Sequence, residues 1–145
     1  MNKIILSLLT LILFSCGASS TKKSESNALF EVLTHQENGG ASILFFEILS
    51  EPNQIVMLQN DEKLKHKINS NDIKTSNFII LNLGEKTSRG YGIKVESVVE
   101  TEKNIVVTFK KIIPDKNTIT TQEITTPYSI VKINSKKEII IIENP

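Results

Sequence analysis

Short apolar runs separated by turn residues fill the chain from Ala28 onward. Most of their apolar residues are β-branched or aromatic, and apolar and polar residues alternate from Gly92 to Val99, which is the period of a half-buried strand. Runs of this length at close intervals are typical of all-β proteins. The expected strands are 28–34, 41–49, 78–83, 91–99, 104–113, 117–126, 128–133 and 138–143, and Gln54 to Leu58 adds another short apolar run. The pattern predicts a mainly β fold, an antiparallel β-sandwich or partly open barrel with one short helix.

Local signals add detail to this fold. The helix is expected at Asn60 to Lys67, with Asn60 or Asp61 as its N-cap. Asn38 and Gly39 tolerate positive φ, so the segments 28–34 and 41–49 are expected to pair across a hairpin turn. The three segments from 78 to 113 are expected to be consecutive antiparallel strands. The isoleucines from Ile139 to Ile142 should be covered on both faces, because neither alternate set is polar.

The loop from Leu83 to Gly92 combines two glycines, a Thr-Ser pair, an arginine and a tyrosine. A nucleotide-binding fingerprint needs a helix directly after its glycines, whereas a strand is expected here. Glycine takes positive φ without steric cost, so a plain turn accounts for the sequence. The alternative is a partner-binding loop formed by Arg89, Gly90 and Tyr91, because arginine and tyrosine are enriched at binding hot spots.

The N-terminus indicates export. Lys3 precedes an apolar stretch from Ile4 to Phe14, which has the length of a secretory signal core and falls short of the roughly 20 residues of a membrane-spanning helix. The stretch ends in Leu-Phe-Ser-Cys-Gly, which resembles the bacterial lipoprotein signal, whose cysteine receives lipid and becomes the new N-terminus. Cys16 is the single cysteine, so it can form no disulfide within the chain. An ordinary signal with an incidental cysteine is the alternative.

These signals divide the chain into three parts. Residues 1–15 are expected to be a lipoprotein signal peptide, and residues 28–145 a single β domain. Residues 16–27 are small, polar or charged, and such a segment buries too little apolar surface to order itself, so a flexible tether is expected. The expected location is the bacterial cell envelope, with lipid on Cys16 holding the protein at the outer membrane or at a periplasm-facing membrane.

Charge and candidate chemistry point away from most enzymes and from nucleic acid. The chain has 17 Lys and Arg residues against 16 Asp and Glu, with no basic block of the kind that binds nucleic acid. Glu62 and His66 lie one helical turn apart, so they are either a pair of metal ligands or part of a solvated helix face. No Gly-x-Ser-x-Gly motif marks a nucleophilic serine. We expect no catalytic residue, no metal and no cofactor.

Residues 78–133 resemble the PrcB C-terminal domain, a module of bacterial exported proteins. The matching features are Leu83-Gly84, Lys86, Gly90-Tyr91, the strands from Ile93 to Val98 and from Ile105 to Thr108, Pro114, Thr121-Gln122 and Pro127-Tyr128. Arg89 stands where the family commonly has a second glycine, and Asp115 to Asn117 replace a Gly/Pro-rich turn.

The resemblance implies a role without chemistry of its own. The family is named for a subunit of a surface protease complex, so the chain is expected to be a lipid-anchored accessory or scaffold protein. Its partner would be another exported protein, with a protease among the candidates. Thr87 to Tyr91 also resembles a loop of the chagasin-like protease inhibitors, but the chain has no Trp, and the residue directly before Pro114 is not an arginine. A small structural lipoprotein without a partner is the third alternative.

Overall fold

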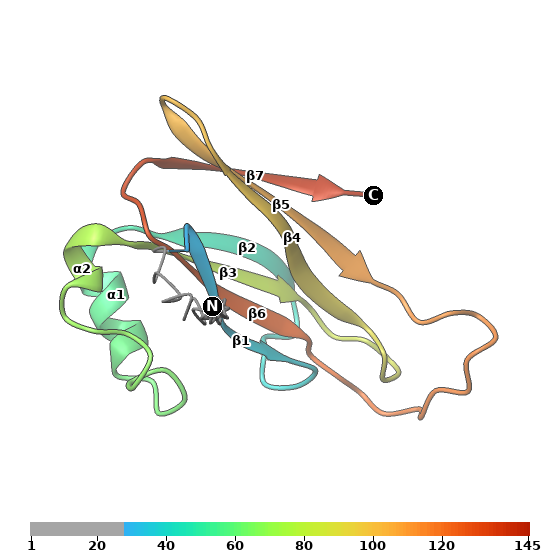
Figure 1. The fold of residues 1–145 in the computed structure, drawn as a ribbon. Coiled ribbons are helices and arrows are strands. Elements are labelled where there is room, and N and C mark those ends of the chain that lie inside the picture. The colour runs from blue at the N-terminus through green and yellow to red at the C-terminus, as the bar shows by residue number, and fades with distance from the viewer. Residues whose placement is uncertain (1–27) are drawn as a thin grey trace, which may run out of the picture.

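The computed structural model describes residues 28–145 as two β-sheets with a helical segment against one of them (Figure 1). The strands are β1 (Phe30–Gln36), β2 (Leu44–Leu49), β3 (Asn77–Leu83), β4 (Gly92–Glu100), β5 (Asn104–Ile112), β6 (Tyr128–Ile133) and β7 (Glu138–Asn144). The helices are α1 (Pro52–Gln59) and α2 (Asp72–Thr75). The predicted mainly β, sandwich-like fold is confirmed, and neither sheet of the described residues closes into a barrel.

The first sheet has the strand order β1-β6-β3-β2, and every neighbouring pair in it is antiparallel. The second sheet has the order β4-β5-β7, with β4 and β5 antiparallel and β5 and β7 parallel. The expectation of consecutive antiparallel strands from 78 to 113 therefore holds for β4 and β5 alone, because β3 lies in the other sheet. The parallel pair arises because the chain crosses from β6 in the first sheet to β7 in the second, so no hairpin fixes the direction of β7.

The predicted hairpin between residues 28–34 and 41–49 is wrong. The strands β1 and β2 lie at opposite edges of the first sheet, with β6 and β3 between them. Gly39 does take a positive φ, of 107°, but the amide of Gly40 donates to the Thr126 carbonyl at 3.0 Å. The loop is thus held by another part of the chain, and β3 and β6, whose residues are almost all buried, occupy the centre of the sheet.

Two groups of buried side chains stabilise this arrangement. Between the sheets, the rings of Phe46 on β2 and Phe109 on β5 have centroids 4.6 Å apart. On the other face of the first sheet, Ile55 and Leu64 pack with Phe78 of β3. The central strands β3 and β6 are therefore covered on both faces, and nearly every residue of both strands is buried.

The helices differ from the predicted one. Residues 60–67 form turns, and α1 lies on the preceding apolar run. Pro52 occupies the first helical turn, where its missing N–H costs nothing, and the Gln54 side chain accepts a hydrogen bond from the Glu51 amide at 3.1 Å. Glu51 and Pro52, which start the helix, precede the apolar run Gln54 to Leu58, whereas the expected N-cap, Asn60 or Asp61, follows that run. The short α2 was not predicted.

The predicted strand at residues 117–126 and the predicted burial of Ile139 to Ile142 on both faces are also wrong. Residues 117–126 form no strand and pair only through an isolated bridge between Lys86 and Thr125, since the segment spans the gap between the two sheets. Ile140 and Ile142 are 41% and 46% exposed, because nothing in residues 28–145 covers the outer face of the second sheet.

Candidate functional site

The loop from Leu83 to Gly92 is shaped by two glycines. Gly84 has a φ of 75° and Gly90 a φ of 91°, a region that favours glycine. A Cβ atom on Gly84 would lie 2.9 Å from the backbone nitrogen of Leu44. The prediction that these glycines serve the backbone is confirmed.

A second loop, residues 113–127, braces the first. Lys86 and Thr125 exchange both backbone hydrogen bonds, at 2.8 and 2.9 Å. The amide of Arg89 donates to the Thr121 carbonyl at 3.2 Å, and the Thr125 hydroxyl donates to the Ser88 carbonyl at 3.1 Å. The segment that was expected to be a strand therefore fixes the conformation of the loop after β3.

Arg89 joins three loops through ion pairs. Its Nη2 lies 3.0 Å from Glu37 Oε2, in the loop after β1, and its Nη1 lies 3.7 Å from Glu123 Oε2, in the loop before β6. The Arg89 side chain is 51% exposed, so solvent screens both pairs. The charge of Arg89 is thus balanced by carboxylates of the same chain.

Tyr91 lies beside two exposed apolar side chains. It is half-buried at the margin of the core between the sheets, and it lines a shallow pocket of about 140 Å³ with Leu44 and Ile113. Leu44 is 52% exposed and Ile113 is 71% exposed. We call Leu44, Tyr91 and Ile113 the loop patch. Adjacent exposed apolar side chains of this kind are a feature of surfaces that bind other proteins.

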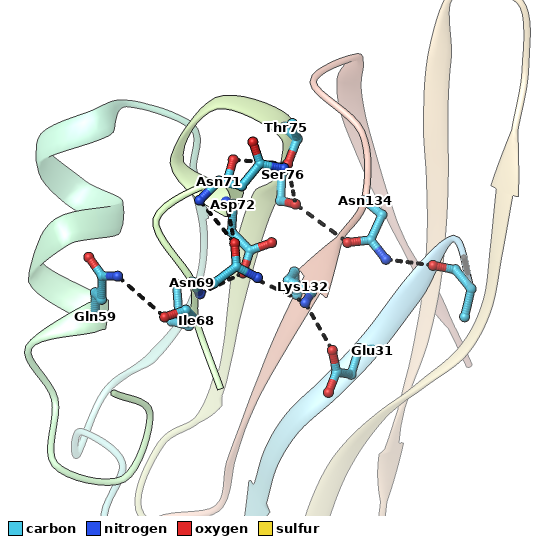
Figure 2. A network of polar contacts seen from close by, with 11 residues as sticks. Glu31, Gln59, Ile68, Asn69, Asn71, Asp72, Thr75, Ser76, Lys132 and Asn134 are labelled. Carbon is cyan, nitrogen blue, oxygen red and sulfur yellow. Dashed lines mark hydrogen bonds and ion pairs between the residues drawn. The ribbon is translucent and has the colours of Figure 1, made fainter. Parts of the chain in front are cut away.

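A polar network lies on the helical side of the first sheet (Figure 2). The ammonium of Lys132, on β6, lies 3.0 Å from the Glu31 carboxylate of β1 and 3.8 Å from the Asp72 carboxylate of α2. The side chains of Lys132 and Asp72 are 10% and 8% exposed. A buried charge without a partner is costly, so the Lys132 and Asp72 charges depend on each other at this depth.

Asn69 completes this network at the start of α2. Its backbone N–H donates to Asp72 Oδ2 at 2.9 Å. Its side-chain Oδ1 accepts from the backbone N–H of Asn71 at 2.9 Å and from that of Asp72 at 3.1 Å. An open groove of about 760 Å³ runs past these residues and is lined mainly by polar side chains. Each charged group in Figure 2 has a partner within the chain, so the network fastens the segment around α2 to β6.

Glu62, one of the two candidate metal ligands, is bound to a lysine of its own segment. Glu62 forms an ion pair with Lys65 at 2.7 Å, and residues 28–145 contain no cluster of three His, Cys, Asp or Glu residues that could hold a metal ion. The pKa of the Glu96 carboxyl is lowered by hydrogen bonds from Lys110 and Asn144. This carboxylate lies on β4, outside the loop patch and outside the network of Figure 2.

Comparison with known families finds a match for the part of the chain from β3 to β6. A family model described as PrcB C-terminal covers residues 77–134. This region matches the PrcB C-terminal family. The resemblance predicted over residues 78–133 is therefore confirmed. Searches of curated proteins and of solved structures found no match.

The PrcB C-terminal region runs from β3 through β6 and contains Arg89, Gly90, Tyr91 and Ile113. Leu44 lies outside it, on β2. Sequence reasoning missed Leu44 and Ile113, because each lies in an apolar run and looks like an ordinary strand residue. Only the fold brings them beside Tyr91.

The predicted lipid anchor, Cys16, lies outside the described residues, as do the predicted signal peptide and tether. Within residues 28–145, every helix is too short or too polar to cross a membrane.

Proposed function

We propose that this protein is a non-catalytic accessory subunit that binds another exported protein. The observation that carries the proposal is the PrcB C-terminal match over residues 77–134. The family is named for a subunit of a surface protease complex, so a role in stabilising such a complex follows from the resemblance. The partner is therefore expected to be an exported protease or a protein that assembles with one.

The loop patch supplies a surface for that partner. The apolar side chains of Leu44 and Ile113 are exposed to solvent. The Tyr91 side chain is partly buried and packs against the core between the sheets. Aromatic anchors held by a rigid scaffold are typical of binding hot spots. Lys86 and Lys111 also line the pocket, and Lys111 forms an ion pair with Glu143 at 2.8 Å. A partner with an apolar contact and an acidic rim would fit this surface.

The proposal also includes attachment to a membrane through Cys16. Its support is the Leu-Phe-Ser-Cys junction after a cationic start and a short apolar core. Several acyl chains, at about 0.8 kcal/mol for each buried methylene, would hold the protein stably at a bilayer. This anchor would confine the subunit to the surface on which an exported complex assembles.

Affinity capture tests this function. The full chain with a tag after Pro145 would be recovered from solubilised bacterial envelope and compared with the tag alone. We expect one exported protein to be recovered in a near-stoichiometric amount with the chain and to be lost with the tag alone. Equal recovery of envelope proteins in both samples would contradict the proposal. Tight inhibition of papain-like proteases by the purified chain would instead support the chagasin-like alternative.

A further inference from the structure

The two sheets present four edge strands, β1 and β2 in the first sheet and β4 and β7 in the second. An edge strand carries backbone groups that can pair with another chain, and proteins commonly protect such edges with bulges or charged side chains. The four edges of this fold are protected to different degrees.

Three of the edges carry such protection. The pairing of β1 is irregular between Val32 and Thr34, and the Leu33 carbonyl of β1 accepts a hydrogen bond from Lys67. The pairing of β4 is irregular after Val95 and the strand includes charged residues. The strand β2 carries the exposed Glu47 near its middle.

The β7 edge lacks these features. Its register with β5 is continuous from Glu138 to Asn144, and its centre is four consecutive isoleucines. Ile140 and Ile142 are exposed on the outer face of the second sheet. The strand lies at the margin of the molecule in Figure 1. A regular edge whose centre is apolar and whose two charged residues lie near its ends favours pairing with another strand.

We propose that β7 pairs antiparallel with β7 of a second copy of this chain, about a two-fold axis at Ile141. In this register all seven residues of β7 pair with the second copy. Ile140 faces Ile142 of the second copy, and Glu138 faces Asn144 of the second copy. The two second sheets then form one continuous sheet across the axis, an arrangement in which both copies use the same surface.

Symmetry and strand length select this register. A two-fold axis within one sheet pairs residues that lie on the same face, which excludes a slip of one residue. An axis at Ile140 or at Ile142 would pair only residues 138–142 or 140–144 of β7. In the proposed register Glu143 faces Ile139 of the second copy. The Glu143 carboxylate is already bound by Lys111, at 2.8 and 3.0 Å, so its charge is compensated within its own chain.

The expected dimer is weak. Seven paired residues, at about 3.3 Å each, give a contact roughly 23 Å long. One pair of strands of this length buries less surface than the interfaces of obligate dimers. We therefore expect a reversible equilibrium between monomer and dimer at micromolar concentrations rather than an obligate dimer.

A charge-swap experiment tests both the surface and the register. The full chain in mild detergent would be compared with the double variants Ile140→Lys/Ile142→Lys and Ile140→Glu/Ile142→Glu by analytical ultracentrifugation. Each double variant alone should dimerise at least about tenfold more weakly than the wild type, because like charges meet across the axis. An equimolar mixture of the two should recover the dimer, since residue 140 of each then faces an opposite charge at residue 142 of the other.

The matched control places two lysines on the same face of the sheet but on the β4 edge, as Ser97→Lys/Val99→Lys. This variant should dimerise like the wild type. A wild type that stays monomeric, double variants that dimerise normally, or a mixture that stays monomeric would each overturn the proposal.

A second measurement covers the case in which the charged variants fail to fold. Ile141→Cys should form a disulfide between residues 141 of two copies under mild oxidation, because residues directly opposite in an antiparallel pair have close Cβ atoms. Peptide mass spectrometry would distinguish this bond from one through Cys16. The control Val99→Cys should not form the corresponding bond, and equal cross-linking of both variants would contradict the proposed axis.

Discussion

Arg89 is bound to Glu37 across two loops, with Nη2 and Oε2 3.0 Å apart. The pair ties the loop after β3 to the loop after β1, and Glu123 adds a contact from the loop before β6. Arg89 was predicted as a partner-binding residue together with Gly90 and Tyr91. The structure gives its charge two partners within the chain and places the exposed apolar surface beside Tyr91 instead.

Replacing Arg89 with alanine should have a small effect on stability. Its two ion pairs are solvent-exposed, and exposed pairs contribute about 0 to 1 kcal/mol. We expect Arg89→Ala to lower the free energy of unfolding by at most about 1 kcal/mol, with the loss shrinking at high salt. Urea denaturation at two salt concentrations would measure this. A loss of several kcal/mol that salt does not change would show that Arg89 is instead part of the packed fold.

Gly84→Ala should be more damaging than Gly92→Ala. At Gly84 the added methyl group would lie 2.9 Å from the backbone nitrogen of Leu44, and the φ of 75° is itself strained for alanine. Strain of this kind costs about 1 to 3 kcal/mol. At Gly92 the nearest atom is a terminal methyl of Ile112 at 3.2 Å, which can move. Thermal unfolding of the two variants should therefore rank Gly84→Ala lower, and the reverse order would contradict the described loop conformation.

Lys132 should contribute more to stability than its exposed partner Glu31. Removing one member of a buried ion pair typically costs about 3 to 5 kcal/mol, because the other charge is left without a partner. We expect Lys132→Ala to approach the lower end of that range, since it leaves Asp72 buried beside Asn69. Glu31→Ala should cost about 1 kcal/mol or less, because the Glu31 side chain is 55% exposed.

A double variant separates charge from packing in this network. Lys132→Met/Asp72→Asn removes both buried charges while keeping side chains of similar size. Its free energy of unfolding, from chemical denaturation, should lie above that of Lys132→Ala. If the double variant were less stable than Lys132→Ala, the Asp72 carboxylate would stabilise the fold mainly by accepting its hydrogen bond from Asn69. The unpaired charge would then not explain the loss in Lys132→Ala.

The sequence pattern predicted the strands of the fold well where they are central. Ile79 lies in the continuous apolar run from Phe78 to Leu81, and burial on both faces leaves few alternatives for such a segment. The pattern could not predict which strands pair. The segments of β1 and β2 flank the turn signal Asn38-Gly39. In the sheet, however, β1 pairs with β6 and β2 pairs with β3, so the two strands are separated.

The candidate site was only partly predictable for a similar reason. Gly84 and Gly90 announce a turn in the sequence, and their positive φ angles follow from it. The neighbours of Tyr91 come from β2 and from the loop directly after β5, and no local signal connects Leu44 with Ile113. The Lys132 network was missed because lysine and aspartate in separate segments look like ordinary surface residues until the sheet brings them together.

Cys16→Ala tests the proposed anchor in cells. Without the thiol no lipid can be attached at this position, so we expect either release of the protein from the membrane fraction or accumulation of an unprocessed precursor. Fractionation followed by intact-mass measurement distinguishes these outcomes from the wild type. A variant that is processed and membrane-bound like the wild type would refute lipid anchoring through Cys16.

The central claim is that the loop patch binds an exported partner, and a matched pair of double variants tests it most directly. Leu44→Ser/Ile113→Ser removes the two exposed apolar side chains of the patch. Val56→Ser/Met57→Ser removes two side chains of comparable exposure, 40% and 74%, from α1. Both variants should keep a thermal midpoint close to that of the wild type, since the changed side chains are largely exposed.

The deciding measurement is the amount of partner recovered by affinity capture from solubilised envelope with each variant. A hot-spot side chain contributes about 2 kcal/mol or more, so the patch variant should recover at least about tenfold less partner than the wild type, while the α1 variant recovers the same amount. Equal recovery by a folded patch variant and the wild type would contradict the account and leave Leu83 to Gly92 as a turn between strands.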